Sequence, residues 1–205
     1  IAMKHLVWLA PVIYFAITWF FPWDVIQWNT TISISYIFDI IFCISCFVIF
    51  RLPIRVGNQD TKGAVSRIIA TIGVAAFSLF IANLFILSAP FKYIELLFLQ
   101  ILILAPLIEE FLFRYAIFGA LEKYFHNKNY LLLSNALLFS LSHAPAIYIL
   151  PKEFHGFVYA QFIYTFFLGW ICAKARLKTG SIIEPIILHF IFNLIFYVAI
   201  IKGII

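Results

Sequence analysis

The chain has 205 residues, of which 65% are hydrophobic and 11% are charged, and its formal net charge is +5. A soluble domain is roughly 45–50% apolar and about 25% charged, so this composition excludes a soluble globular protein and predicts an integral membrane protein. The basic residues are scattered between apolar runs, which excludes a nucleic-acid-binding surface and indicates charges that set membrane topology. We expect one integral membrane domain over residues 1–205.

Apolar runs and polar breaks predict an all-α, polytopic transmembrane helical bundle. Ile1 and Ala2 precede Met3, and we interpret these two residues as a cloning remnant. Trp23 and Trp28 lie between the first two runs, where interfacial aromatic residues are expected. The predicted spans number about seven: 6–21, 32–50, 64–87, 91–125, 130–150, 157–174 and 182–201.

The fourth run is unusually long for a membrane helix. At 1.5 Å per residue it would extend about 50 Å, whereas the hydrocarbon core is about 30 Å thick. It is therefore either one tilted helix or two helices bent near Pro106, and the second case would raise the count to eight.

The basic residues favour one orientation of these spans. Most of them fall in loops on one side, and the positive-inside rule makes that side cytoplasmic, with the N-terminus inside and the C-terminus outside. The basic-rich side has Lys4, Arg51, Arg55, Lys62, Arg67, Lys123, Lys128, Lys174, Arg176 and Lys178, and the other side has Lys92, Lys152 and Lys202.

A few ionisable residues occur inside the predicted spans, where each charged side chain costs several kcal/mol unless it is paired, protonated or hydrated. Such residues usually indicate a polar cavity used for chemistry or transport. They are Asp39, Glu109, Glu110, Arg114, His143, Glu184 and His189.

Glu110 and Arg114 are spaced i, i+4, so they share a helix face in the order that favours an ion pair. Glu109 projects about 100° around the helix and has no obvious partner within it. A carboxyl group next to an ionised one is suited to take a proton from water. We therefore predict Glu109 as the general base, while the Glu110–Arg114 pair is equally compatible with a purely structural staple.

Three further polar side chains lie on two other predicted helices. His143 ends the sequence Phe139-Ser-Leu-Ser-His143, and a lone histidine there is either catalytic or hydrogen-bonded to a neighbour. His189 and Asn193 are spaced i, i+4, so both can donate to one oxyanion or form an ordinary interhelical hydrogen bond. With Glu109 they form a set suited to attack of water on an amide carbonyl. For Asp39 the sequence leaves two alternatives open, a place in the same cavity or a pair with a lysine or arginine, and Glu184, beside Pro185, is expected at the membrane interface.

The sequences Glu109-Glu110-Phe-Leu-Phe-Arg114, Phe139-Ser-Leu-Ser-His143 and His189-Phe-Ile-Phe-Asn193 occur in the order of the EExxxR, FxxxH and HxxxN motifs. In these motifs the chain resembles the CPBP intramembrane proteases, the family of CAAX proteases and bacteriocin-processing enzymes also called Abi. The resemblance covers a catalytic core over about 101–196, and the first three predicted helices match nothing by this criterion.

The resemblance implies a glutamate-dependent intramembrane endopeptidase with no cofactor or metal. It implies that Glu109, aided by His143, activates water, that His189 and Asn193 stabilise the oxyanion, and that Glu110 and Arg114 shape the site. The expected partners are a membrane-anchored or lipidated protein or peptide substrate and the surrounding lipids. We expect a multi-pass protein of a prokaryotic cell membrane.

Three other functions are consistent with the same residues. Glu109, His143 and His189 could supply a two-histidine, one-carboxylate zinc site, although the chain has no HExxH motif. A proton-coupled transporter would use the carboxylates as a relay, but such proteins often show inverted repeats, and none is evident here. A non-catalytic membrane scaffold would more often lack one of the motif residues.

Overall fold

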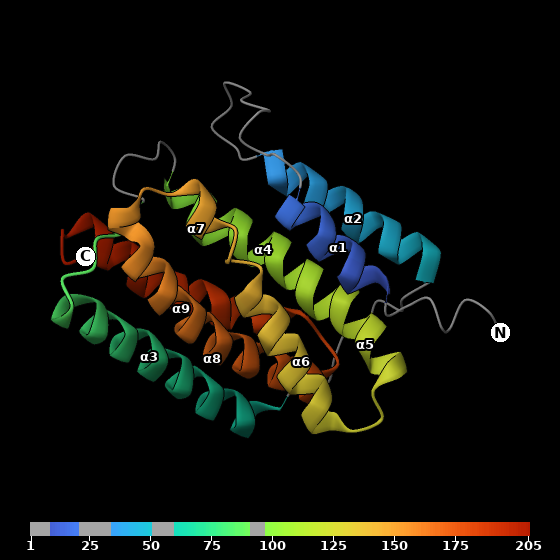
Figure 1. Cartoon of the computed structure of the whole chain (residues 1–205). Helices are drawn as coiled ribbons and strands as arrows, with labels where there is room; N and C mark the ends of the chain where they lie inside the picture. The colour runs from blue at the N-terminus through green and yellow to red at the C-terminus, as the bar shows by residue number, and fades with distance from the viewer. Residues whose placement is uncertain (1–8, 21–33, 51–59, 91–96) are drawn as a thin grey trace.

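The computed structural model of the chain describes residues 9–20, 34–50, 60–90 and 97–205, and the described part is helical without strands (Figure 1). Trp23, Trp28 and the first two residues lie outside it. The helices are α1 (Leu9–Phe20), α2 (Ile34–Phe50), α3 (Thr61–Leu84), η2 (Leu99–Leu104), α4 (Ala105–Glu110), η3 (Phe111–Ile117), α5 (Phe118–Tyr124), α6 (Lys128–Leu141), α7 (Ala146–Ile149), η4 (Lys152–Phe154), α8 (His155–Thr179) and α9 (Ile183–Ile201).

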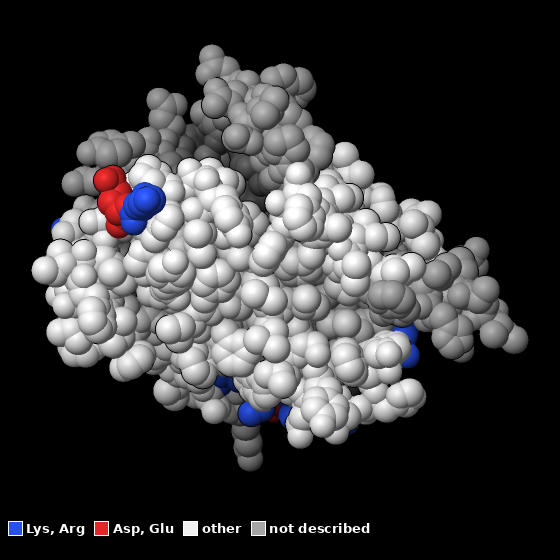
Figure 2. Space-filling view, in the orientation of Figure 1, with Lys and Arg blue, Asp and Glu red and all other residues white. Residues whose placement is uncertain are grey.

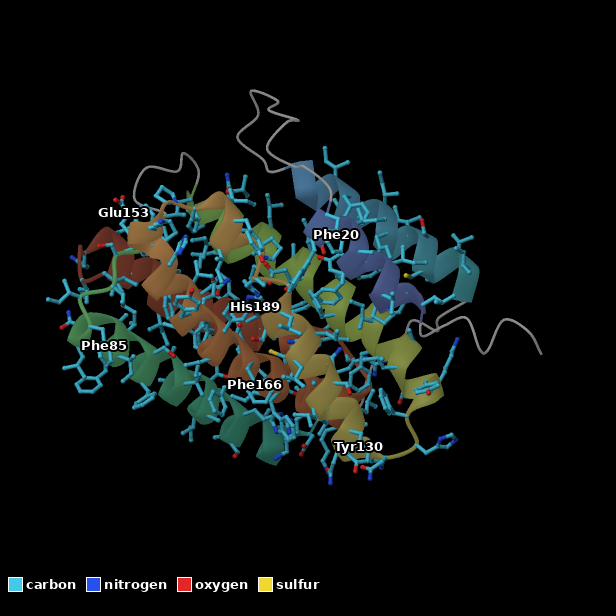
Figure 3. The ribbon with its side chains drawn as sticks, in the orientation of Figure 1. Phe20, Phe85, Tyr130, Glu153, Phe166 and His189 are labelled. Carbon is cyan, nitrogen blue, oxygen red and sulfur yellow. The ribbon has the colours of Figure 1, made fainter. Side chains whose placement is uncertain are left out.

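The helices are those of an integral membrane protein. Four segments in the described part are long and apolar enough to cross a membrane: 63–84, 128–149, 152–179 and 183–201. Two shorter apolar helices, 9–20 and 37–49, accompany them. Large apolar side chains cover the outside, and Phe20, Phe85 and Tyr130 project outward in Figure 3 while His189 lies within the bundle. The all-helical prediction is confirmed, whereas the count of about seven spans stays a prediction.

Charged side chains lie mainly at the ends of the bundle. Figure 2 shows a broad uncharged face, with Lys and Arg atoms along its lower rim and a small acidic and basic group at the upper left. The starts of α3, α6 and α9 and the end of α8 meet at the lower end in Figure 1. The described residues at these helix ends therefore share one end of the bundle, Arg51 and Arg55 lie outside the described residues, and the assignment of that end to the cytoplasm stays a prediction.

One irregular helix runs from η2 to α5 without a break, because the residue at each junction keeps right-handed helical dihedral angles. The segments η2 and η3 are π-helical turns on either side of α4, which carries Glu109 and Glu110. In the first of them the Ala105 N–H donates to the carbonyl of Gln100, five residues earlier. In that register Pro106 would bond the carbonyl of Ile101, but proline has no N–H. The chain thus passes Pro106 in continuous helical geometry, and the number of membrane spans that this segment makes stays a prediction.

Side chains from other helices satisfy carbonyls of this irregular helix. Asn193 Nδ2 donates to the Ile101 carbonyl at 2.8 Å and so replaces the missing proline N–H. In η3, buried Asn135 donates to the carbonyl of Phe113 at 2.9 Å, and Arg176 Nε donates to the carbonyl of Arg114 at 3.0 Å. These contacts matter because an unpaired carbonyl inside a membrane protein costs several kcal/mol.

The helices α6, α8 and α9 form the centre of the bundle, with α3 packed against α8 and α9. Gly169 of α8 allows α6 to approach closely, because a Cβ atom there would lie 3.0 Å from Phe139 Cδ1 and 3.3 Å from Ala136 Cα. On the other side, α2 packs against α4 and η3. This arrangement encloses the acidic α4 segment between α2 and the central helices.

Two helix ends differ most from the predictions. α8 continues to Thr179 instead of ending at Lys174, and Gly180 then ends it in the left-handed conformation (φ 71°), with its N–H bonded to the Arg176 carbonyl. The helix after His126 ends at Leu141, so His143 lies in the turn before Pro145 and not within the helix. The turn is expected from proline, which disfavours helical geometry in the residue before it.

An ion-pair cluster joins the start of α3 to the start of α9. Arg67 binds both carboxylate oxygens of Glu184, with Nε–Oε1 at 2.6 Å and Nη2–Oε2 at 3.1 Å. It also contacts Asp60 Oδ2 at 3.1 Å, and Asp60 caps α3 by accepting from the Gly63 N–H. The Gly63 N–H and the Arg67 guanidinium lower the pKa of Asp60. Glu184, which was expected only to lie at the interface, thus fixes α9 against α3.

Replacing Arg67 with Gln is expected to lower the unfolding free energy by about 1–3 kcal/mol, because Glu184 would lose a charged hydrogen-bond partner. Thermal unfolding in detergent measures the loss. Lys128→Gln, which removes an exposed cation at the start of α6, is the matched control and should leave the midpoint unchanged. The double variant Arg67→Gln/Glu184→Gln should lose less stability than the sum of the losses in Arg67→Gln and Glu184→Gln. A loss in the double variant equal to that sum would contradict the pairing.

Candidate active site

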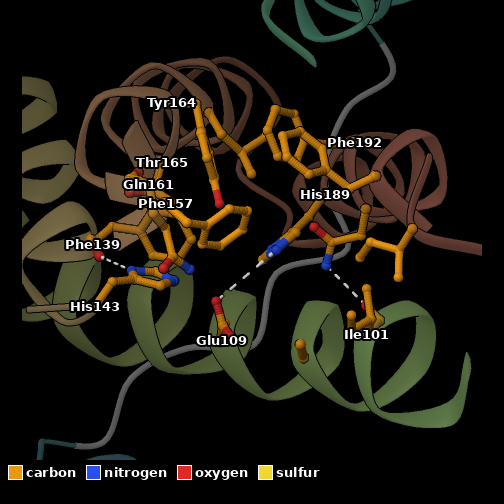
Figure 4. Close-up of a pocket in the computed structure, with 15 residues that line it drawn as sticks. Ile101, Glu109, Phe139, His143, Phe157, Gln161, Tyr164, Thr165, His189 and Phe192 are labelled. Carbon is orange, nitrogen blue, oxygen red and sulfur yellow. Dashed lines mark hydrogen bonds and ion pairs between the residues drawn. The ribbon is translucent and has the colours of Figure 1, made fainter. Parts of the chain in front are cut away.

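The four predicted catalytic side chains line one cavity of about 230 Å³ (Figure 4). Glu109 comes from α4, His143 from the turn after α6, and His189 and Asn193 from α9. Residues separated by up to 84 positions in the sequence are thus brought together by the packing of three segments. The cavity has room for more than one water molecule, each of which occupies about 30 Å³ in the liquid.

Glu110 and Arg114 form the predicted ion pair behind the cavity wall. Arg114 Nε lies 3.0 Å from Glu110 Oε2, and both side chains are fully buried. The two atoms are in ion-pair contact without the alignment of a hydrogen bond. The guanidinium also lies over the Phe139 ring, with Cζ 4.5 Å from its centroid, so an aromatic face stabilises the buried cation.

Glu110 has a second partner, which spacing along one helix could not reveal. Its Oε1 accepts a hydrogen bond from His189 Nδ1 at 2.9 Å. Because a carboxylate only accepts, Nδ1 must carry a proton, and this leaves Nε2 facing the cavity. The Arg114–Glu110–His189 chain therefore fixes both the ring orientation and the tautomer of His189.

Glu109 is the more accessible of the two glutamates. Its side chain is 22% exposed, whereas that of Glu110 is not exposed at all. Glu109 Oε2 faces His189 Nε2 at 4.0 Å, as the dashed line in Figure 4 marks. The predicted difference between the glutamates is confirmed in geometry, because one is locked in a buried pair and the other lines the cavity.

His143 has a defined orientation as well. Its Nδ1 lies 3.0 Å from the Phe139 carbonyl, which can only accept, so Nδ1 carries the proton and Nε2 of the neutral ring has a free lone pair. The Phe139 ring contacts both imidazoles edge-on, with centroids 5.3 Å from His143 and 5.8 Å from His189. Phe139 therefore organises both histidines and Arg114, a role that the sequence motif did not indicate.

This geometry combines a partly exposed carboxylate, two oriented imidazoles and an amide around one cavity whose lining is otherwise mostly apolar. A carboxylate and an imidazole lone pair can bind and deprotonate water, and N–H groups can stabilise developing negative charge. The cavity therefore brings together the kinds of side chain that hydrolysis by activated water requires.

A comparison with protein families matches residues 90–195, just over half of the chain, to the family described as type II CAAX prenyl endopeptidase Rce1-like. The chain belongs to this family. Searches of curated proteins and of solved structures found no match. The match contains all seven motif residues and confirms the resemblance seen in the sequence, so the chain is a member of a family of membrane proteases.

In this Rce1-like chain, α1 and α2 lie before the matched segment and place a further acid near α4. Asp39 of α2 is buried, does not line the cavity, and hydrogen-bonds to Tyr14 of α1. The sequence left open whether Asp39 lines the cavity or pairs with a cation. The hydrogen bond to Tyr14 gives it a neutral partner.

Sequence reasoning missed the α8 wall of the cavity. Gln161, Tyr164, Thr165 and Leu168 follow the spacing i, i+3, i+4, i+7 and all line it. That spacing was available as a signal, because three residues capable of hydrogen bonding share one face in the mainly apolar first part of α8.

Among the described residues, no group of three or more His, Cys, Asp or Glu side chains is placed to hold a metal ion. Glu109, His143 and His189 of this Rce1-like chain line the same cavity without forming such a cluster. Whether the reaction needs a metal is decided by the chelation experiment below.

Proposed function

We propose that this chain is an intramembrane endopeptidase that cleaves a peptide bond in a membrane-anchored or lipidated protein or peptide. The observation that supports it best is the convergence of Glu109, His143, His189 and Asn193 on one cavity inside the segment matched to a protease family. A purely structural role would require the buried Glu110–Arg114 ion pair, but it would not require the accessible carboxylate of Glu109 beside it.

In the proposed mechanism Glu109 removes a proton from water while His143 Nε2 accepts a hydrogen bond from the same water. The water oxygen bonds to the carbonyl carbon, and the carbonyl oxygen gains the negative charge. His189 Nε2, when protonated, and the second N–H of Asn193 donate toward that oxygen. Glu109 then delivers its proton to the amide nitrogen as the C–N bond breaks, which restores the ionised glutamate.

The family description suggests a prenylated CAAX peptide as the first substrate to test. Peptide pheromone or bacteriocin leaders and membrane-anchored sorting tails are the other substrate classes. A prokaryotic cell membrane is the proposed location, and lipid is the proposed surrounding of the substrate.

The test uses the purified full chain in proteoliposomes with three peptides: a prenylated CAAX peptide, the same peptide without the lipid, and a leader peptide. Mass spectrometry should find cleavage of at least one of them. Cleavage that continues after exhaustive chelation supports the glutamate mechanism, and loss that is restored by added zinc supports the zinc alternative. A chain that cleaves none of the three, nor any membrane-protein terminus in comparative proteomics, would overturn the proposal.

A further inference from the structure

The wall of the cavity that faces α4 comes from α8, and the mechanism above assigns it no function. Its polar members are Gln161, Tyr164 and Thr165 (Figure 4). Thr165 has a local partner, because its hydroxyl donates to the Gln161 carbonyl at 2.6 Å. Tyr164 is different, because its hydroxyl points into the cavity toward the side where Glu109 and His189 lie.

Three aromatic contacts hold the Tyr164 ring in place. The ring centroids lie 5.0 Å from Phe196, 5.6 Å from Phe192 and 6.3 Å from Phe157. The residue is only 8% exposed. A side chain packed in this way has one orientation, so its hydroxyl is aimed at a fixed point in the cavity.

The Tyr164 hydroxyl has no hydrogen-bond partner among the described residues. The hydroxyl is open to the cavity and is not enclosed in protein, whereas a phenylalanine in the same place would offer the cavity no donor. A donor that is open to the cavity and has no partner in the protein is available to a group that enters the cavity and accepts a hydrogen bond.

The donors expected from the motif are partly committed elsewhere. His189 Nδ1 donates to Glu110, and its Nε2 donates only when the ring is doubly protonated. One N–H of Asn193 donates to the Ile101 carbonyl that Pro106 cannot satisfy. A neutral phenol keeps its proton at physiological pH and is free to donate at all times.

We propose that Tyr164 is a further catalytic residue that donates a hydrogen bond to the carbonyl oxygen of the peptide bond being cleaved and to the oxyanion formed from it. This inference rests on the proposed endopeptidase function. Tyr164 keeps its proton throughout and forms no covalent bond. Its contribution is greatest when the oxygen carries negative charge, so it acts mainly on the rate of the chemical step.

Tyr164→Phe tests the inference, because it removes the hydroxyl and keeps the ring. We expect kcat to fall by roughly 10²-fold with KM nearly unchanged, the loss typical of one oxyanion donor. The thermal unfolding midpoint should not fall, since no protein partner is lost. Tyr197→Phe is the matched control, because Tyr197 lies on α9 outside the cavity, where its ring packs on Phe98.

A Tyr164→Phe variant with wild-type kcat would overturn the inference, and so would a rise in KM with kcat unchanged. Glu109→Gln, assayed beside it on the same peptide, separates the two proposals. If Glu109→Gln is inactive and Tyr164→Phe is fully active, only the role of Tyr164 fails. If Glu109→Gln is fully active, the endopeptidase mechanism itself fails.

Discussion

Replacing Glu109 with Gln is expected to abolish peptide hydrolysis while leaving the bundle folded. The substitution keeps the size of the side chain and removes its ability to take a proton from water. Loss of a general base typically lowers the rate by about 10²–10⁴-fold, which would bring turnover of a membrane peptidase close to background. Turnover of the reconstituted chain, measured with saturating peptide, gives kcat for both forms.

Glu122→Gln is the matched control, because Glu122 is exposed on α5 and does not line the cavity. It should behave as wild type. His143→Ala should also lose activity, since it removes the lone pair expected to hold the water. Wild-type turnover in Glu109→Gln would contradict the assignment of the base, whatever the effect of His143→Ala.

Replacing Arg114 with Ala is expected to cause the largest loss of stability. The change leaves the Glu110 carboxylate fully buried with His189 as its remaining partner and removes the cation over Phe139. Breaking a buried ion pair from one side typically costs about 3–5 kcal/mol, because the other charge is left uncompensated. The thermal unfolding midpoint in detergent should fall clearly.

The double variant Arg114→Ala/Glu110→Gln should recover part of this stability. A glutamine still accepts the hydrogen bond from His189 Nδ1 but carries no charge that needs a cation. Arg114→Lys should be intermediate, because lysine keeps the charge and loses the planar stacking on Phe139. If the stability lost in Arg114→Ala/Glu110→Gln equals the sum of the losses in Arg114→Ala and Glu110→Gln, the two side chains do not act as a pair.

Local spacing predicted the parts of the site that lie within one helix. The i, i+4 spacing correctly paired Glu110 with Arg114 and left Glu109 free to line the cavity. The same spacing placed His189 and Asn193 on one face, and both line the cavity. These inferences succeeded because helix geometry fixes which neighbours meet.

Contacts between distant segments were not predictable from spacing. The bond from His189 to Glu110 joins residues 79 positions apart, and the bond from Arg67 to Glu184 joins residues 117 positions apart. Both depend on how the helices pack against one another. The sequence therefore indicated the chemistry of His189 without showing that a carboxylate sets its tautomer.

The π-helical turns were also missed, because hydrophobic periodicity does not distinguish them from a regular helix over a few residues. Pro106 suggested a break, but Asn193 supplies the donor that the proline lacks, so the helix continues. Asn193 thus has a structural role that the motif alone did not reveal. Its second N–H is the one that remains for an oxyanion.

The ion pair between Arg67 and Glu184 has a practical consequence for the smallest fragment that could be active. Arg67 lies on α3, before the segment matched to the family, whereas Glu184 lies in the first turn of the helix that carries His189. Phe196 and Ile200, which line the cavity, lie beyond the other end of the match. A piece trimmed to the family boundaries would carry every motif residue yet lose one anchor of α9 and part of the cavity wall. The minimal peptidase should therefore be sought by cutting between helices, with α3 and the whole of α9 retained.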